Sequence, residues 1–268
     1  GPYRDYLGMD ITLQAISGVM SVTGEEGGPP LKTAAAFADF IAGTHLYAAI
    51  VTALFRRETT GQGAIVDISM QDCVFPTLAT TIGSFYAQGK QMPRAGNRHT
   101  GNTLAPYNTY VASDGYIAII CIREGHFKKL CQAMDQPELA EDPRFHNFAA
   151  RCQNVTELDA EITRWSAPKS RQTLLALTQA HGVICAPVNH LSEVVTDPHM
   201  TARGSLHQRP HETLGMIAQM QTPLRLSGDT PPALTSPAAL GADSSEVLHD
   251  LLGLSQADMA TLVEQGAI

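Results

Sequence analysis

One segment restricts the possible folds more than any other. A short apolar run at residues 64–70 leads within two residues into a helical stretch from Cys73 to about Ala87. The run is rich in β-branched residues and follows a glycine turn at residues 61–63, a pattern typical of a strand. A strand that turns directly into a helix is the building unit of α/β proteins, which place their chemistry where the strand ends. We therefore predict an α/β fold with Asp72 at a functional position.

Two helices are predicted before this unit. Residues 10–20 repeat apolar side chains at helical spacing, and residues 35–57 form a second helix rich in alanine and glycine. Small side chains let another element approach closely, so we expect the second helix to be buried. A Gly/Pro-rich break at residues 24–30 separates the two.

The pattern changes after Lys90. A polar loop at residues 93–102 is followed by a predicted hairpin that turns at Ser113-Asp114-Gly115. Helices are then expected at residues 125–134, 155–165 and 171–181, with a strand at 183–188. A hairpin followed by helices indicates a smaller α+β domain. We predict three parts: residues 1–92 as the first part of a large domain, 93–190 as the small domain with its linkers, and 191–268 as the return to the large domain.

Charge and cysteine content exclude several classes of protein. The net charge is −8, with no basic surplus, which argues against a nucleic-acid partner. No apolar run is judged long enough to cross a membrane, so no membrane partner is expected. Five cysteines without a C-x-x-C pair indicate neither a disulfide framework nor a structural zinc site, and they suit a reducing cytoplasm. The histidines are scattered, so no metal site is predicted.

Asp72 is the best single candidate for chemistry, and two interpretations of it are open. Spacing alone favours a helix N-cap, in which the carboxylate accepts a hydrogen bond from the first-turn amides. The functional interpretation is a carboxylate nucleophile at the start of a helix, where the anion is stabilised and able to attack an acyl carbon. The neighbouring Cys73 is expected to be a buried structural thiol.

The loop at residues 96–102 is the second candidate. It is either a plain linker between domains or a mobile lid that closes over a reacting centre and excludes water. Arg94 and Arg98 either bind a phosphate or carboxylate there or are solvated.

Many short blocks along the chain resemble the class III CoA-transferases, the formyl-CoA transferase and carnitine CoA-transferase type. In chain order the main blocks are Gly8-Met9-Asp10, Gln14-Ala15-Ile16-Ser17-Gly18, Gly61-Gln62-Gly63, Val66-Asp67-Ile68-Ser69-Met70-Gln71-Asp72, Arg94-Ala95-Gly96-Asn97-Arg98-His99, Asp142-Pro143-Arg144-Phe145, Ala186-Pro187-Val188 and Asp197-Pro198-His199. No single block is decisive, but this many in the same order make a specific signal.

The resemblance implies a fold, an activity and a set of site residues. The fold is a Rossmann-like large domain with a smaller α+β domain, in an interlocked homodimer. The activity is transfer of coenzyme A from an acyl-CoA to a free carboxylic acid through an aspartyl anhydride and an aspartyl-CoA thioester. CoA thioesters are then substrates, and no cofactor is bound permanently. Asp72 is the implied nucleophile; the implied substrate-binding residues are Met9, Asp10, Gly96, Asn97, Arg98, His99 and Gly101.

Two alternatives remain. The α-methylacyl-CoA racemases share this fold but pair the aspartate with a histidine where this chain has Met9. Methionine takes no proton, and racemisation needs two acid/base groups, so epimerisation is disfavoured. Family members also carry a region before the first residues of this sequence, with most of the contacts to the CoA nucleotide. The second alternative is therefore a non-catalytic fragment of the family.

Overall fold

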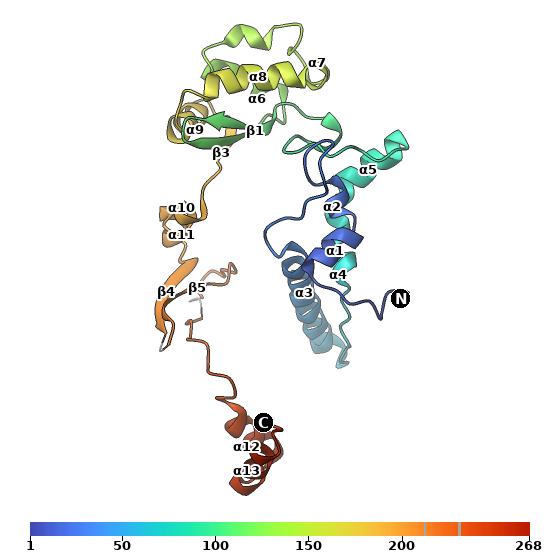
Figure 1. Ribbon diagram of the computed structural model, residues 1–268, viewed down its shortest axis with the longest axis vertical. Helices are drawn as coiled ribbons and strands as arrows, with labels where there is room; N and C mark the ends of the chain where they lie inside the picture. The colour runs from blue at the N-terminus through green and yellow to red at the C-terminus, as the bar shows by residue number, and fades with distance from the viewer. Residues whose placement is uncertain (212, 230–231) are drawn as a thin grey trace. The chain divides into compact units, whose positions relative to one another are not determined.

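The computed structural model describes residues 1–211, 213–229 and 232–268. The chain forms two compact units, Gly1–Val188 and Asn189–Ile268. Figure 1 shows the order of the elements along the chain.

The first unit begins with helices that share a small core. They are α1 (Asp10–Ile16), α2 (Val19–Val22), α3 (Phe37–Thr60), α4 (Met70–Val74) and α5 (Ala79–Gln88), with a 3-10 turn at Phe75–Leu78. The helix predicted over residues 10–20 is interrupted at Gly18, whose φ of 91° is the left-handed conformation that glycine adopts without strain. Val19, Ala38 and Val74 form the buried centre of this region.

The predicted strand at residues 64–70 is absent from the described part of the chain. No strand is assigned between Gly61 and Ser69, and Ile65 is 99% exposed. A strand needs a neighbour to accept and donate its backbone hydrogen bonds, and no other described strand lies beside this segment. The prediction of a parallel α/β unit here is therefore not met, and the fold is a mixture of helices and antiparallel sheet.

Helix α3 is as long as predicted, but the expectation that it is buried is wrong. Only Ala38 and Ala42 are buried, near its first turn. Along the rest of the helix the following large apolar residues are exposed: Phe40, Leu46, Tyr47, Ile50, Val51, Leu54 and Phe55.

The expectation that no segment is long and apolar enough to cross a membrane is also wrong. One helix meets both criteria, length and composition. Helix α3 has 24 residues and contains an 18-residue window with a mean hydropathy of 1.4. The small residues that indicated close packing also raise the hydropathy. A single helix of this kind is weak evidence for a membrane span, because core helices of soluble proteins pass the same test.

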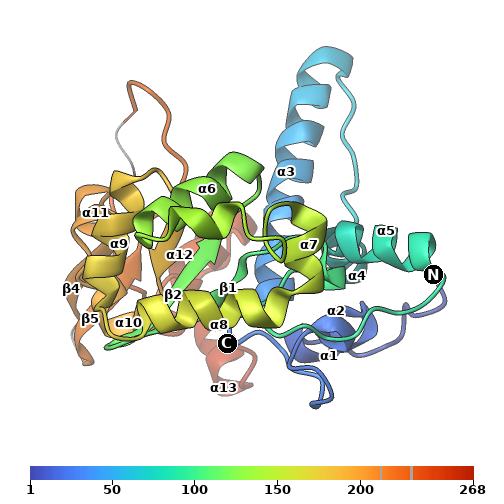
Figure 2. The ribbon, with the colours of Figure 1, turned by 90° about the horizontal axis from the view of Figure 1, so that it is seen from above.

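The part of the first unit that follows the loop contains a three-stranded antiparallel sheet. Its strands are β1 (Tyr107–Ala112), β2 (Gly115–Ile120) and β3 (Ile184–Pro187), in that spatial order. Its helices are α6 (Glu124–Ala133), α7 (Phe148–Gln153), α8 (Val155–Ser166) and α9 (Arg171–Ala180), with a 3-10 turn at Pro137–Ala140. Helix α8 lies along the sheet, as Figure 2 shows. The hairpin, the strand β3 and three of the four helices follow the prediction; α7 is an addition.

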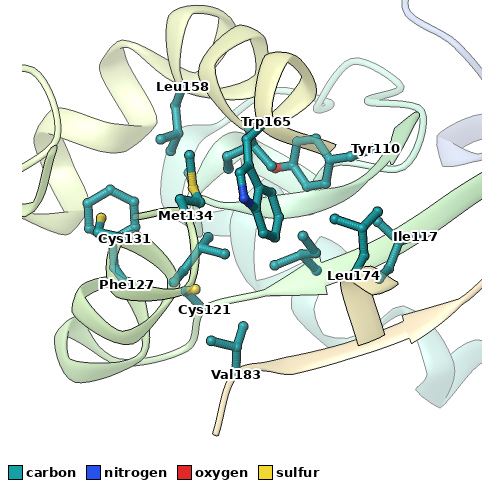
Figure 3. Close-up of a cluster of buried hydrophobic side chains, with 14 of the residues drawn as sticks. Tyr110, Ile117, Cys121, Phe127, Cys131, Met134, Leu158, Trp165, Leu174 and Val183 are labelled. Carbon is teal, nitrogen blue, oxygen red and sulfur yellow. The ribbon is translucent and has the colours of Figure 1, made fainter. Parts of the chain in front are cut away.

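A closed hydrophobic core holds this domain together (Figure 3). Tyr110 and Ala112 of β1 alternate with exposed neighbours, so one face of the strand is turned to the core. The helices complete it with the buried side chains Phe127, Leu130, Leu158, Ile162, Trp165 and Leu174.

A fully buried arginine joins the helices of this domain to the end of the loop. Arg151 of α7 is 0% exposed, and its guanidinium lies over the rings of Phe127 and Phe148, at 4.5 and 4.6 Å from their centroids. Nε donates to the carbonyl of Ala105 at 2.8 Å, and Nη1 pairs with a carboxylate oxygen of Glu124 at 2.9 Å. The charge is thus compensated by both a carboxylate and aromatic faces.

The second unit is built from short elements. They are α10 (Leu191–Val194), α11 (Pro198–Ala202), a hairpin of β4 (Leu206–His211) and β5 (Gly215–Met220), α12 (Ser244–Leu252) and α13 (Gln256–Glu264). The sequence pattern indicates one or two strands at residues 216–226 and two capped helices at residues 244–252 and 256–265, in agreement with β5, α12 and α13. It does not predict β4. Among the described residues of this unit, Met259 alone is a buried hydrophobic residue.

Candidate functional site

Asp72 lies in the first turn of α4, and the residue that caps this helix is Ser69. The Ser69 hydroxyl accepts a hydrogen bond from the Asp72 amide at 3.3 Å, so the interpretation of Asp72 as the N-cap is wrong. The Asp72 residue is exposed, and none of the described residues donates a side-chain hydrogen bond to its carboxylate. Its carboxylate is therefore open to a reaction partner.

The neighbouring thiol is unsuited to act as the nucleophile. Cys73 is buried, and burial, together with the negative charge of Asp72, raises the pKa of the thiol. Since the thiolate is the reactive form, a raised pKa makes Cys73 less reactive at neutral pH.

Met9 and Asp10 stand at the start of α1 and have different environments. The Met9 side chain is exposed. The Asp10 carboxylate accepts from Gln14 Nε2 at 2.8 Å and from the amide of Ala38 at 2.9 Å. Asp10 therefore caps the N-terminus of α3, which ties the first helix to the third.

The loop at residues 93–102 forms a wall shared by two cavities. The first cavity, of about 520 Å³, lies between this loop, the Glu25-Glu26 turn and the start of β1. The second, of about 550 Å³, lies between the loop and the sheet face at Ala118, Ile120 and Ile184. Asn97 and Arg98 line both cavities. Asp72, Met9 and Asp10 line neither of these two cavities.

The first half of the loop is attached to the turn at residues 21–28. The Arg94 guanidinium donates to the carbonyls of Ser21 and Gly28, and the Gly96 amide donates to the carbonyl of Gly24 at 2.9 Å. Gly96 has a φ of 58°, and a Cβ there would come within 2.7 Å of the Glu25 carboxylate. Only glycine fits this position without a shift of its neighbours.

The second half of the loop is attached to the small domain. Asn97 Nδ2 donates to the Thr109 hydroxyl at 2.9 Å, and His99 meets the Tyr107 ring edge-on at 5.4 Å. The Arg98 guanidinium pairs with the carboxylate of Asp159 through Nε and Nη2, both at 2.8 Å. Arg98 is therefore not simply solvated: it already binds a carboxylate, one that belongs to the protein.

The structure thus brings one group of predicted residues together and leaves another apart. Asn97 and Arg98 line both cavities, Gly101 lines the first and Gly96 the second. Sequence reasoning missed Asp159, which lies on α8 beside the buried Leu158. The only indication in the sequence was a carboxylate beside the apolar face of a predicted helix. Such a pattern does not predict which side chain the carboxylate binds. No group of three metal-ligating side chains is found among the described residues.

Comparison with known proteins finds a family that the sequence of this chain matches. The family model described as CoA-transferase family III matches residues 1–244. A formyl-CoA:oxalate CoA-transferase of Streptomyces avermitilis is 33% identical over the whole of this chain and 69% of its own length. A succinyl-CoA–D-citramalate CoA-transferase of Chloroflexus aurantiacus is 34% identical over 98% of this chain and 65% of its own length. The chain thus spans about two thirds of the length of these relatives.

A solved structure supports the same placement. A CAIB/BAIF family protein from Brucella suis superposes with a TM-score of 0.77 and is 33% identical, over 94% of this chain and 65% of that one.

Proposed function

The chain belongs to CoA-transferase family III, a family of enzymes, and on that premise we propose that it transfers coenzyme A from an acyl-CoA to a free carboxylic acid. The observation that carries the proposal is the family match over residues 1–244, which includes Asp72. Asp72 is the proposed nucleophile, and its open carboxylate in the first turn of α4 supports this role. Acyl-CoA and the acid are substrates, and no permanently bound cofactor is required.

The proposed reaction proceeds in four steps. The Asp72 carboxylate attacks the thioester carbonyl of the donor, which forms a mixed anhydride and releases the CoA thiolate. The thiolate attacks the Asp72 carbonyl of the anhydride, which leaves an aspartyl-CoA thioester and frees the donor acid. The carboxylate of the acceptor acid then displaces the thiolate and forms a second anhydride. The returning thiolate attacks the acceptor's acyl carbon, which yields the new acyl-CoA and restores the Asp72 carboxylate. Acyl-transfer potential is conserved, so no ATP is consumed.

The anhydrides must be kept from water, and the loop at residues 96–101 is proposed for this task. Its residues Gly96, Asn97, Arg98, His99 and Gly101 are the proposed substrate-binding group, with Met9 and Asp10 beside the thioester. The two cavities that the loop borders, of about 520 and 550 Å³, are large enough for parts of a CoA thioester or for a small acid.

Epimerisation is the second candidate, and the chain's own residues disfavour it. A racemase needs a proton acceptor and a proton donor on opposite faces of the α-carbon. The position where the racemases carry histidine is Met9 here, whose exposed thioether takes no proton. A non-catalytic fragment would perform neither reaction.

A homodimer is the proposed assembly, with the Rossmann-like large domain that the family implies built from residues 1–92 and 191–268. The exposed apolar side chains of α3 support a protein partner for this helix, because a soluble monomer seldom exposes such a continuous apolar surface. The proposed location is the cytoplasm, which suits five free cysteines.

Mass spectrometry of a trapped intermediate tests the proposal. The protein is incubated with a donor acyl-CoA and then digested with trypsin, which releases residues 58–90 as one peptide. A CoA-sized adduct is expected on this peptide at Asp72. The matched control is Asp67→Ala, which removes another exposed carboxylate of the same peptide and should leave the adduct in place. A racemase would instead scramble a chiral acyl-CoA without an acceptor acid, and a non-catalytic fragment would give neither result.

A further inference from the structure

The side chain of Asp159 is a meeting point for three other side chains. Its Oδ2 accepts from Arg98 Nε and Nη2, both at 2.8 Å, and from Asn108 Nδ2 at 3.0 Å. Its Oδ1 accepts from the Tyr110 hydroxyl at 2.8 Å. The Asp159 side chain is only 12% exposed, whereas that of Arg98 is 34% exposed. A carboxylate this far out of water is tolerated because donors surround it.

The donors come from two different parts of the chain. Asn108 and Tyr110 stand two residues apart on β1 and so share one face of the strand. Burial, reinforced by the charge of Asp159, raises the pKa of Tyr110 well above its usual value, which keeps the hydroxyl as a donor. Arg98 comes from the loop and is separated from Asp159 by 61 residues. Asp159 therefore joins the loop to the sheet and to α8.

Two more bonds attach the end of the loop and the residues just after it to α7. Asn102 Nδ2 donates to the carbonyl of Cys152 at 2.6 Å, and Arg151 Nε donates to that of Ala105 at 2.8 Å. The segment from Arg98 to Ala105 is thus held at three points by α7 and α8. Such a segment forms a fixed wall, whereas a lid needs room to swing on a hinge.

We propose that Asp159 is a positioning residue for the CoA-transfer reaction, which holds Arg98, and through it the loop at residues 93–102, as a fixed wall between the two cavities. This inference rests on the proposed function. Within the proposed substrate-binding group, it gives Arg98 the indirect role of holding the cavity wall; the alternative is that Arg98 contacts a substrate carboxylate itself. The two roles make different predictions for Asp159.

Amide hydrogen exchange of residues 94–102 tests the wall directly, without any need for activity. Asp159→Asn removes the charge that Arg98 contacts, and Arg98→Met breaks the same pair from its more exposed side. We expect exchange in this segment to rise about tenfold in each variant, as loss of a charge-assisted bond predicts, and to rise no further in the double variant. Arg98→Lys keeps a charge and should recover part of the protection.

Tyr110→Phe is the matched control. It removes one hydrogen bond from Asp159 but acts on Oδ1, away from Arg98. Loop exchange should stay within about twofold of the original protein, even though the domain loses some stability. Equal loop exchange in Asp159→Asn and the original protein would overturn the proposal. So would a rise in Tyr110→Phe as large as that in Asp159→Asn, because the effect would then be general destabilisation. Should Asp159→Asn fail to fold, Arg98→Met and Arg98→Lys still decide the question.

Steady-state kinetics separate positioning from direct binding. Positioning predicts that Asp159→Asn and Arg98→Met lower kcat by similar factors and leave the KM of the acid within about twofold. A rise in that KM confined to Arg98→Met would overturn the proposal in favour of direct contact. Should the protein transfer no CoA to any acid, the proposed function fails, but the exchange measurements still decide whether Asp159 holds the loop.

Discussion

The two parts of the first unit differ in how completely they bury their own apolar side chains. Residues 105–183 contain a closed cluster of seventeen buried hydrophobic residues, among them Tyr110, Phe127 and Leu158. The helices of residues 10–88 share a cluster of three: Val19, Ala38 and Val74. Helix α3 alone exposes seven large apolar side chains. Residues 105–183 complete a hydrophobic core of their own. The helices of residues 10–88 leave apolar surface open, which another polypeptide segment could cover.

The difference matters because the proposed nucleophile lies in the open part. Asp72 stands in α4, which packs on α3, while the loop and the first of the two cavities lie between the two parts. A surface that is apolar and continuous favours burial against another chain or segment. We therefore expect changes in the buried core of residues 105–183 to affect stability, and changes among the helices of residues 10–88 to affect activity and assembly.

The largest expected effect is on activity, from Asp72→Ala. Removal of the nucleophile should lower CoA transfer at least about 10⁴-fold, because no neighbouring group can form the anhydride. The free energy of unfolding should change little, since the Asp72 side chain is exposed and its helix is capped by Ser69. Coupled assays and denaturant unfolding measure the two quantities. Activity close to that of Asp67→Ala would contradict the mechanism.

The next effect is on stability, from Arg151→Met in the closed domain. The substitution leaves the buried carbonyls of Ala105 and Phe145 without their donor and removes the partner of Glu124. We expect a loss of about 3–5 kcal/mol in the free energy of unfolding. Arg164→Met is the control, because that arginine forms an exposed ion pair with Glu161 and should cost less than about 1 kcal/mol. Equal losses in the two variants would show that burial of the Arg151 guanidinium adds nothing to the stability of this part.

Alkaline pH should also weaken the closed domain. Burial raises the pKa of the Cys121 and Cys131 thiols to about 12 from an ordinary value near 9. The unfolded chain therefore loses these protons at a lower pH than the folded chain. Their full contribution to the free energy of unfolding is present below pH 9 and is lost as the pH rises from 9 towards 12. The slope from each thiol is about 1.4 kcal/mol per pH unit. Between pH 8 and 11, the free energy of unfolding should fall less steeply with pH in Cys121→Ala than in the original protein. An unchanged slope would show that the Cys121 thiol does not contribute.

The smallest effect on stability is expected from Phe55→Ser on α3. The Phe55 side chain is 73% exposed, so the fold should lose less than about 0.5 kcal/mol. Self-association should nevertheless weaken, because the substitution places a hydroxyl on the surface that the partner is proposed to cover. Light scattering over a range of concentrations measures this. An unchanged association constant would show that the α3 surface is not the contact.

Local patterns in the sequence predicted much of the closed domain. The apolar spacing of residues 155–165 indicated α8, and the turn at Ser113-Asp114-Gly115 indicated the hairpin of β1 and β2. The same reasoning failed at residues 64–70, where β-branched residues indicated a strand that the described structure lacks. Helical periodicity depends on neighbours within one turn, but a strand depends on a partner that the local sequence does not contain.

By itself the sequence determined the family, through blocks spread from Gly8 to His199, and with it the candidate Asp72. It also determined most of the longer helices and the hairpin of β1 and β2, whose hydrogen bonds join near neighbours. Only the tertiary structure decided that Arg98 is held by Asp159, 61 residues away, and that α3 leaves its apolar side chains open. The physical reason is that burial and charge pairing depend on which distant segments meet, and a residue's own neighbours in the chain do not select them.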